Sequence, residues 1–146
     1  MAKAPLLLLA RHPSSVDPMQ KALLAGGIYF AGVFSAGFAL GTLRVLVLAP
    51  RLGELVAVLA ELPFMLGIAW LFCGWLVGRL TVPRQVGPRL VMGALGFGLL
   101  MIAEIALSTL LFGLSLPEFL AALVTPEGAI GLAGQVLFGL MPLLRR

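Results

Sequence analysis

Four long apolar stretches constrain this chain more than any other feature of its sequence. They cover residues 22–43, 55–78, 90–112 and 128–144. Each is close to the roughly 20 residues that an α-helix needs to cross the ~30 Å hydrocarbon core of a bilayer. The sequence therefore predicts an all-α, polytopic membrane protein, with a single four-helix transmembrane domain over residues 18–146 and a cytoplasmic or membrane-surface tail over residues 1–17.

Composition and charge agree with this class and exclude several others. Hydrophobic residues make up 61% of the chain and charged residues only 11%, whereas soluble domains average about 25% charged residues. The net charge is +4, but the basic residues are scattered singly, so the expected partner is the lipid bilayer and no nucleic acid is expected. The single Cys73 excludes a disulfide framework within the chain.

Prolines mark the expected starts of the helices. Asp17 and Pro18 form an N-cap followed by a first-turn proline, and Pro50, Pro88 and Pro126 precede or open the other three apolar stretches in the same way. Proline is favoured in the first turn because its missing N–H has no partner there in any case. The division into four helices thus has support from a second signal.

The distribution of Lys and Arg predicts the orientation. With a cytoplasmic N-terminus, eight of the 10 basic residues lie on the cytoplasmic side and two on the other, which is a positive-inside pattern with both termini cytoplasmic. The eight are Lys3, Arg11, Lys21, Arg79, Arg84, Arg89, Arg145 and Arg146, and the two are Arg44 and Arg51. Arg51 and Glu54 are expected to form a solvated outer rim.

Two shorter segments are expected at the membrane surface. Ser115 and Glu118 have the spacing of a capping box, and apolar residues follow at helical spacing, which predicts an interfacial helix between the third and fourth spans. Residues 4–10 are expected to form a short membrane-surface segment. They do not resemble a cleaved signal peptide, because Arg11, His12 and Pro13 stand where small residues would be needed.

Glycine faces predict which sides of the spans pack together. Lipid tails are as apolar as leucine, so helices in a bilayer associate where small residues allow close approach. At ~100° per residue, the glycines expected to pack share a helix face with a polar residue in each of three spans. They are Gly26, Gly37 and Gly41 with Arg44 in the first span, Gly93 with Glu104 in the third, and Gly128, Gly131 and Gly139 with Gln135 in the fourth. Pro63 is expected to kink the second span, whose rotation stays open.

Ionisable side chains within the apolar stretches predict an internal polar network. Arg44 follows the first stretch directly, Glu61 and Glu104 interrupt the second and third, and Gln135 lies in the fourth. An isolated charge near the bilayer centre costs at least ~2.5–3.5 kcal/mol. Given the predicted spans, all four residues fall near the middle or in the outer half of the bilayer. We therefore expect Arg44, Glu61 and Glu104 to meet away from lipid, with Gln135 bordering them.

No pattern in the sequence indicates catalysis or a cofactor. Ser108 and Thr109 have no histidine or lysine at matching depth to activate them, and His12 lies in the tail. There is no haem, metal, nucleotide or flavin signature, so neither an enzyme nor a resident cofactor is expected. Tyr29, Trp70 and Trp75 are expected to face lipid or the interface.

The run GTLRVLVLAPRLGELVAVLAELP, residues 41–63, is similar to a segment of small four-helix proteins of the bacterial inner membrane. The resemblance covers a minor part of the chain. It implies a location in the bacterial inner (cytoplasmic) membrane and implies no activity.

Two functional hypotheses from different classes follow. The first is a non-enzymatic accessory or assembly component, acting as a homo-oligomer or within a larger membrane complex, in which the polar network only fixes helix contacts. The second is a small proton-linked transporter or channel. Two acids against one base leave excess negative charge, so one glutamate, Glu104 being the deeper, is expected to hold a proton unless water or a cation reaches it.

Overall fold

The computed structural model describes residues 17–145. Predictions for the tail, including the surface segment at residues 4–10 and His12, lie outside the described residues, as does Arg146. Within the described range the chain is helical, has no strand and contains four helices long and apolar enough to cross a membrane. The prediction of an all-α chain with four long apolar helices is confirmed.

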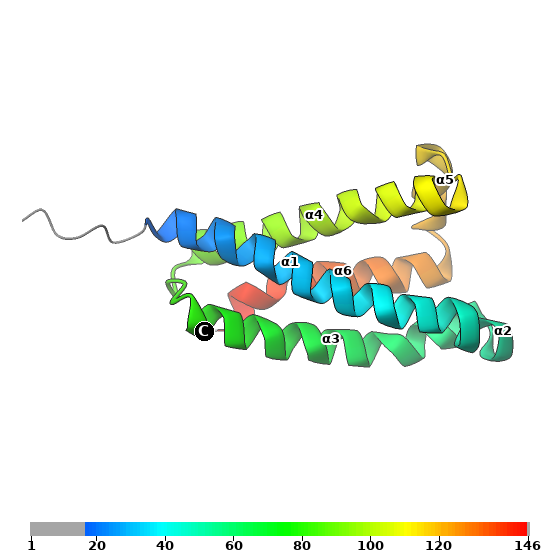
Figure 1. Cartoon of the computed structure of the whole chain (residues 1–146), viewed down its shortest axis with the longest axis horizontal. Coiled ribbons are helices and arrows are strands. Elements are labelled where there is room, and N and C mark those ends of the chain that lie inside the picture. Colours follow the sequence, from blue (N-terminus) through cyan, green and yellow to red (C-terminus); the bar gives the residue numbers. More distant parts are fainter. Residues whose placement is uncertain (1–16, 146) are drawn as a thin grey trace, which may run out of the picture.

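The four long helices are joined by short connections, and a shorter helix follows the third of them (Figure 1). The elements in chain order are α1 (Pro18–Leu43), the π-helical segment η2 (Arg44–Leu48), α2 (Ala49–Leu52), α3 (Glu54–Arg79), α4 (Val86–Phe112), α5 (Leu116–Ala122) and α6 (Pro126–Leu144).

Caps and prolines begin the first and last long helices as the sequence predicts. The Asp17 carboxylate accepts the Met19 N–H at 2.9 Å at the start of α1. The Thr125 hydroxyl accepts the Gly128 N–H at 3.1 Å at the start of α6. Pro18 and Pro126 occupy the first turns of these helices.

The boundary between the first two long helices differs from the prediction. The helix does not end at Leu43 but continues through η2 and α2 to Leu52, giving a helical run of 35 residues. Pro50 lies inside α2 and does not open the next long helix. That helix starts after Gly53, whose φ of 82° is a left-handed conformation that glycine adopts without strain.

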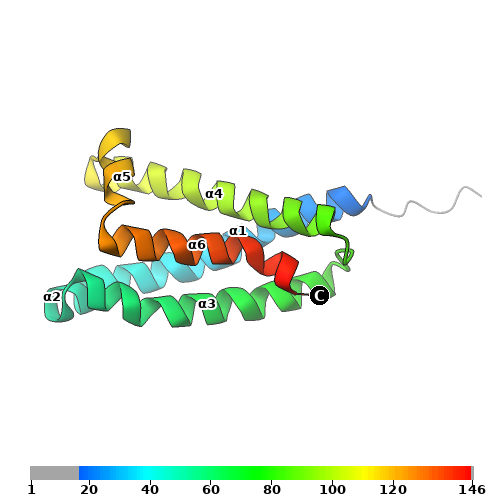
Figure 2. The ribbon, with the colours of Figure 1, turned by 180° about the vertical axis from the view of Figure 1, so that it is seen from behind.

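The long helices form a four-membered bundle in which each helix packs against two neighbours. α1 contacts α3 and α4, and α6 contacts the same two helices from the other side. Figure 2 shows α6 between α4 and α3 from behind, with the short α5 joining the far ends of α4 and α6. Helices α1 and α6 therefore face each other across the centre.

Small residues lie inside the bundle and many large apolar residues lie outside. Ala22, Ala25, Ala57 and Ala69 are buried, while Leu110 is 81% exposed. Other large apolar side chains on the exterior are Leu24, Phe64, Leu71, Ile102 and Val136. Large apolar side chains are buried as well, such as Leu76 and Met92, but a soluble bundle would leave far fewer of them exposed, because their burial drives its folding.

Tyr29 forms the centre of the packed core, contrary to the expectation that it faces lipid. Its side chain is 0% exposed and its ring stacks on Phe138 with 4.3 Å between centroids. The hydroxyl donates to the Phe138 carbonyl at 3.2 Å. A tyrosine can be buried here because its ring packs against apolar side chains and its hydroxyl donates a hydrogen bond to a carbonyl group of α6.

Arg89 joins three parts of the bundle at the end where the chain termini lie. The sequence places it among the basic residues of a cytoplasmic connection, yet it is only 4% exposed. Its Nε donates to the Pro83 carbonyl at 2.9 Å, and its terminal nitrogens donate to Val82 at 3.2 Å and Pro142 at 3.4 Å. The planar guanidinium supplies several donors in fixed directions, so one side chain satisfies carbonyls of the α3–α4 connection and of α6.

Glycines allow the closest contacts between the helices. At Gly93 a Cβ would overlap the carbonyl oxygen of Gly139, so α4 and α6 touch through their backbones. At Gly26 a Cβ would lie 2.9 Å from the Met92 carbonyl oxygen, which sets the distance between α1 and α4. Gly128, also a predicted packing position, lies against the end of α5 at Ala122.

The predicted capping box of the short helix is present. The Glu118 carboxylate accepts the Ser115 N–H at 2.7 Å and the Ser115 hydroxyl at 2.6 Å. These hydrogen bonds stabilise the ionised carboxylate and lower the pKa of Glu118. Helix α5 therefore begins where the sequence predicts, and its placement at a membrane interface stays a prediction.

Gly93→Ala should destabilise the bundle strongly. The added methyl group would overlap the backbone of α6, which cannot move without separating the two helices, and overpacking of this kind costs about 1–3 kcal/mol or more. Gly98→Ala is the matched control, because nothing lies within 4 Å of a Cβ at that position of α4. Unfolding in detergent micelles would measure both variants, and equal stability of the two would contradict the close contact.

Arg89→Met should lower the free energy of unfolding by about 1–3 kcal/mol, because it leaves buried carbonyl groups without a donor. Arg84→Met, in the exposed part of the same connection, removes an equal charge and should change stability little. The same unfolding measurement distinguishes them. An equal effect of both substitutions would show that charge, and not the hydrogen bonds of Arg89, accounts for the loss.

Candidate functional site

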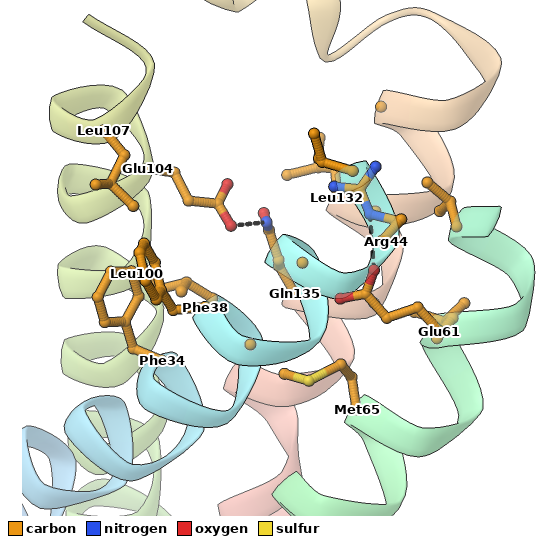
Figure 3. Close-up of a pocket in the computed structure, with 18 of the residues that line it drawn as sticks. Phe34, Phe38, Arg44, Glu61, Met65, Leu100, Glu104, Leu107, Leu132 and Gln135 are labelled. Carbon is orange, nitrogen blue, oxygen red and sulfur yellow. Dashed lines mark hydrogen bonds and ion pairs between the residues drawn. The ribbon is translucent and has the colours of Figure 1, made fainter. Parts of the chain in front are cut away.

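A cavity of about 690 Å³ lies between the four long helices, in the half of the bundle that carries α2 and α5. It is bordered by the C-terminal half of α1, the first half of α3, the second half of α4 and the N-terminal half of α6. Figure 3 shows polar side chains from η2, which continues α1, and from α3, α4 and α6 facing this space. All four residues of the predicted polar network line it.

Arg44 forms one side of the polar wall together with Glu61 and pairs with a second glutamate outside the cavity lining. Its Nε lies 2.7 Å from a carboxylate oxygen of Glu61 on α3. A terminal nitrogen of Arg44 also pairs with Glu54, at the start of the same helix. The Glu61 side chain is 15% exposed and that of Glu54 50% exposed. Glu54, predicted to lie on the rim, therefore belongs to the ion-pair network as well.

Glu104 and Gln135 form the other side of the polar wall. The Gln135 side-chain amide donates to a Glu104 carboxylate oxygen at 2.6 Å, joining α6 to α4 (Figure 3). The amide oxygen of Gln135 is buried and has no hydrogen-bond partner among the described residues. An unpaired buried acceptor costs about 1–3 kcal/mol, so this oxygen is a position where a donor would bind favourably.

The predicted network is thus divided into two pairs. Arg44 contacts glutamates of α3, whereas Glu104 contacts the amide of α6. No hydrogen bond or ion pair between Arg44 and Glu104 is formed within residues 17–145. The cavity lies between the pairs, so the polar groups are not packed directly against one another.

The predicted packing glycines divide between helix contacts and the cavity. Gly37 approaches Met65 at 3.1 Å and Gly139 approaches Phe97 at 3.2 Å, measured from an added Cβ. At Gly41 and Gly131 nothing lies within 4 Å of that position, and both residues line the cavity. These two glycines therefore keep space open and do not bring helices together.

The π-helical segment places Arg44 at the cavity wall. The Ala49 N–H bonds to the Arg44 carbonyl, five residues earlier. Pro50 follows directly, and in an α-helix its ring would clash with the carbonyl of Leu46. We attribute the wider turn to this proline, because a π turn moves the carbonyl groups away from the proline ring. Single π turns of this kind are frequent at functional sites. Ordinary helical projection from the sequence misses this change of phase.

Pro63 lies on an exposed position within α3, which continues as one helix from Glu54 to Arg79. Because proline has no N–H, the carbonyl of Leu59 loses its usual helical donor. The position of Pro63 is two residues after Glu61. The bend expected at Pro63 stays a prediction.

The cavity opens to the exterior between α1 and α4. Near the termini α1 lies close to α4 through Gly26, but at Gly32 and Gly37 its neighbours are Phe72 and Met65 of α3. Figure 1 shows the far ends of α1 and α4 lying apart. Exposed residues from the two separated ends, Phe38, Thr42, Leu46, Leu111 and Phe112, line the opening.

Apolar and aromatic side chains make up most of the remaining wall. Phe34 and Phe38 come from α1 and Phe138 from α6, with Met65 and Leu100 on the helices between them. These phenylalanines are not among the site residues predicted from the sequence. The available signal is their spacing, since Phe34 and Phe38 are one helical turn apart and precede Gly41 and Arg44 on the same side of the helix.

Within residues 17–145 no group of three or more His, Cys, Asp and Glu side chains is placed to hold a metal ion. The single cysteine, Cys73, is buried in the packed half of the bundle.

Comparison of the chain with protein-family models, curated proteins and solved structures finds no match.

Glu61→Gln should lower the free energy of unfolding by about 1–2 kcal/mol, a value between those of exposed and buried ion pairs. The substitution keeps the size of the side chain and removes the charge that faces the Arg44 Nε. Glu54→Gln is the matched control and should cost less than about 1 kcal/mol, because that carboxylate is half exposed. Unfolding in detergent micelles tests the order, and a larger loss in Glu54→Gln would contradict it.

Proposed function

We propose that this protein is an integral membrane protein of the bacterial inner membrane, with four spanning helices and both termini on the cytoplasmic side. The support is the apolar exterior of the bundle combined with helices of 19 to 35 residues, since ~20 residues cross a bilayer. The eight-to-two distribution of basic residues supports the orientation.

Within that membrane protein, the central cavity binds a small solute, and the protein acts as a carrier for it. The observation that supports this most is that Arg44, Glu61, Glu104 and Gln135 border a cavity of about 690 Å³ as two separate pairs and do not form one packed cluster. Ligand pockets of proteins measure about 300–1,000 Å³ and combine an apolar wall with a few polar groups. A network that only fixed helix contacts would need no such space.

Glu104 is the group proposed to couple proton movement to the solute. It lies at the cavity wall with an amide as its hydrogen-bond partner, whereas the carboxylate of Glu61 is held by the Arg44 guanidinium. A carboxyl group in a transporter commonly exchanges a proton for its substrate. No covalent chemistry is proposed, and neither is a cofactor.

Transport can be tested in vesicles with an imposed pH gradient and a panel of radiolabelled small organic solutes. The wild-type protein should accumulate at least one solute, and Glu104→Gln should abolish the dependence on the gradient. Gly131→Phe should also reduce uptake, because the ring would occupy the cavity, while Gly98→Phe adds the same ring where a Cβ has no neighbour within 4 Å. A folded protein with neither binding nor uptake across the panel would contradict the proposal.

A role as an accessory component of a larger complex is the second candidate. It is favoured by Gly27, Gly67 and Gly98, where none of residues 17–145 comes within 4 Å of an added Cβ. Small residues of this kind allow another helix to approach closely in a bilayer. Native mass measured in mild detergent distinguishes this candidate, since an accessory protein would be recovered with a second polypeptide or with further copies of itself.

A further inference from the structure

We propose that the solute is an amphipathic organic cation, namely a protonated amine attached to an apolar and preferably aromatic body. This inference rests on the proposed function and specifies the ligand of the same cavity. It follows from the charge of the wall, from its hydrogen-bond acceptors, from its aromatic side chains and from the position of its opening.

The charges of the cavity wall are predominantly negative. Three carboxylates, Glu61, Glu104 and Glu127, line the cavity, against the single guanidinium of Arg44. Arg44 is already paired with Glu61 and with Glu54. Glu127 lies in the first turn of α6, where the helix dipole stabilises a carboxylate. Glu104 is therefore the carboxylate for which the described residues provide least compensation.

The hydrogen-bonding groups of the wall also favour a donor. Glu104 uses one carboxylate oxygen for the amide of Gln135 and keeps the other for a further donor. The amide oxygen of Gln135 is buried without a partner. An alkylammonium group carries up to three N–H donors and no acceptor, so one such group can bind both Glu104 and Gln135. A carboxylate ligand would instead place its own acceptor oxygens next to the acceptor oxygens of Glu104 and Gln135.

The rest of the wall fits an apolar body. Phe34, Phe38 and Phe138 line the cavity together with Leu100 and Met65. Aromatic rings attract cations through their negatively charged faces and stack with other rings at offset geometry. A volume of about 690 Å³ accommodates a molecule of drug size.

The position of the opening supports the same ligand class. The cavity reaches the exterior between α1 and α4, among exposed side chains such as Phe38, Leu111 and Phe112. In the proposed membrane orientation this opening faces the bilayer and not water. A solute that dissolves in the membrane by its apolar body, with its charge near the headgroups, can enter the cavity from the side.

Three probes with one body and different head groups test the ligand class. They are 2-(1-naphthyl)ethylamine, 2-(1-naphthyl)ethanol and 3-(1-naphthyl)propionate, titrated by calorimetry into the full-length protein in micelles at neutral pH. The amine is protonated and the acid ionised under these conditions. The wild-type protein should bind the amine at least about tenfold more tightly than the alcohol, and the propionate most weakly.

Glu104→Gln should remove that preference. Affinity for the amine should fall about ten- to a hundredfold, while affinity for the alcohol should stay within about threefold, which also shows that the variant is folded. Glu118→Gln is the control, because Glu118 lies on α5 outside the cavity and glutamine also serves in a capping box. It should retain the wild-type preference.

The outcomes separate this inference from the proposed function. Equal binding of the three probes, or tighter binding of the alcohol or propionate, would overturn the cationic class and leave a solute-binding cavity in place. Binding of the amine that persists in Glu104→Gln would overturn the assigned role of Glu104. Binding of none of the three probes, alongside uptake of another solute from the panel, would overturn the ligand class alone.

Discussion

The backbone contact between α4 and α6 at Gly93 and Gly139 is the constraint on which the rest of the bundle depends. A Cβ at Gly93 would overlap the Gly139 carbonyl oxygen, so the two helices meet there without intervening side chains. Tyr29 fills the space beside this contact with its ring on Phe138. Arg89 then joins the α3–α4 connection to α6 by hydrogen bonds. In this half of the molecule glycines allow the helices to approach closely, and the side chains of Tyr29 and Arg89 donate hydrogen bonds to backbone carbonyl groups. The half is closed for these two reasons.

The closed half determines the geometry of the other half. Helix α1 lies against α4 near Gly26 but against α3 at Gly32 and Gly37, so it crosses the bundle face as it proceeds. Its far end therefore leaves α4, and the space between the two becomes the opening of the cavity. Glycines in this half, such as Gly41 and Gly131, border open volume. The same residue type thus allows contact at one end and provides space at the other.

Much of the fold could be predicted from the sequence, because length, apolarity and caps act locally. The four long helices, the Asp17 cap, the first-turn proline Pro126 and the α5 capping box follow from local sequence signals. The end of the first helix could not be predicted in this way. Pro50 suggested a helix start, whereas the chain accommodates it with a π turn and breaks only at Gly53.

The candidate site was only partly accessible to sequence reasoning. Apolar surroundings make each charged residue within a span conspicuous, so Arg44, Glu61, Glu104 and Gln135 could be named, and all four line the cavity. Their division into two pairs depends on helix rotation, which has no local signature, and on a π turn, which Pro50 does not by itself predict because a proline also marks a helix start. Tyr29 was misplaced because its partner Phe138 is 109 residues away in sequence, and Arg89 was misplaced because its burial involves the Pro142 carbonyl, 53 residues away, as well as nearby carbonyls.

Among the described residues, hydrogen-bond partners are missing in both halves of the bundle, at the Gln135 amide oxygen beside the cavity and at the Arg145 Nε in the closed half, but only the first of these groups lies next to other incompletely compensated polar groups. In the closed half the Tyr29 hydroxyl and the Arg89 guanidinium donate to backbone carbonyls at fixed positions. In the open half the Gln135 amide oxygen lacks a donor and Glu104 has only an amide for a partner. A chain selected only for stability would replace such groups by apolar residues, because an unpaired buried polar group costs free energy that packing could recover. Their presence beside a cavity is the basis of the proposal that a bound molecule supplies the missing donor and positive charge.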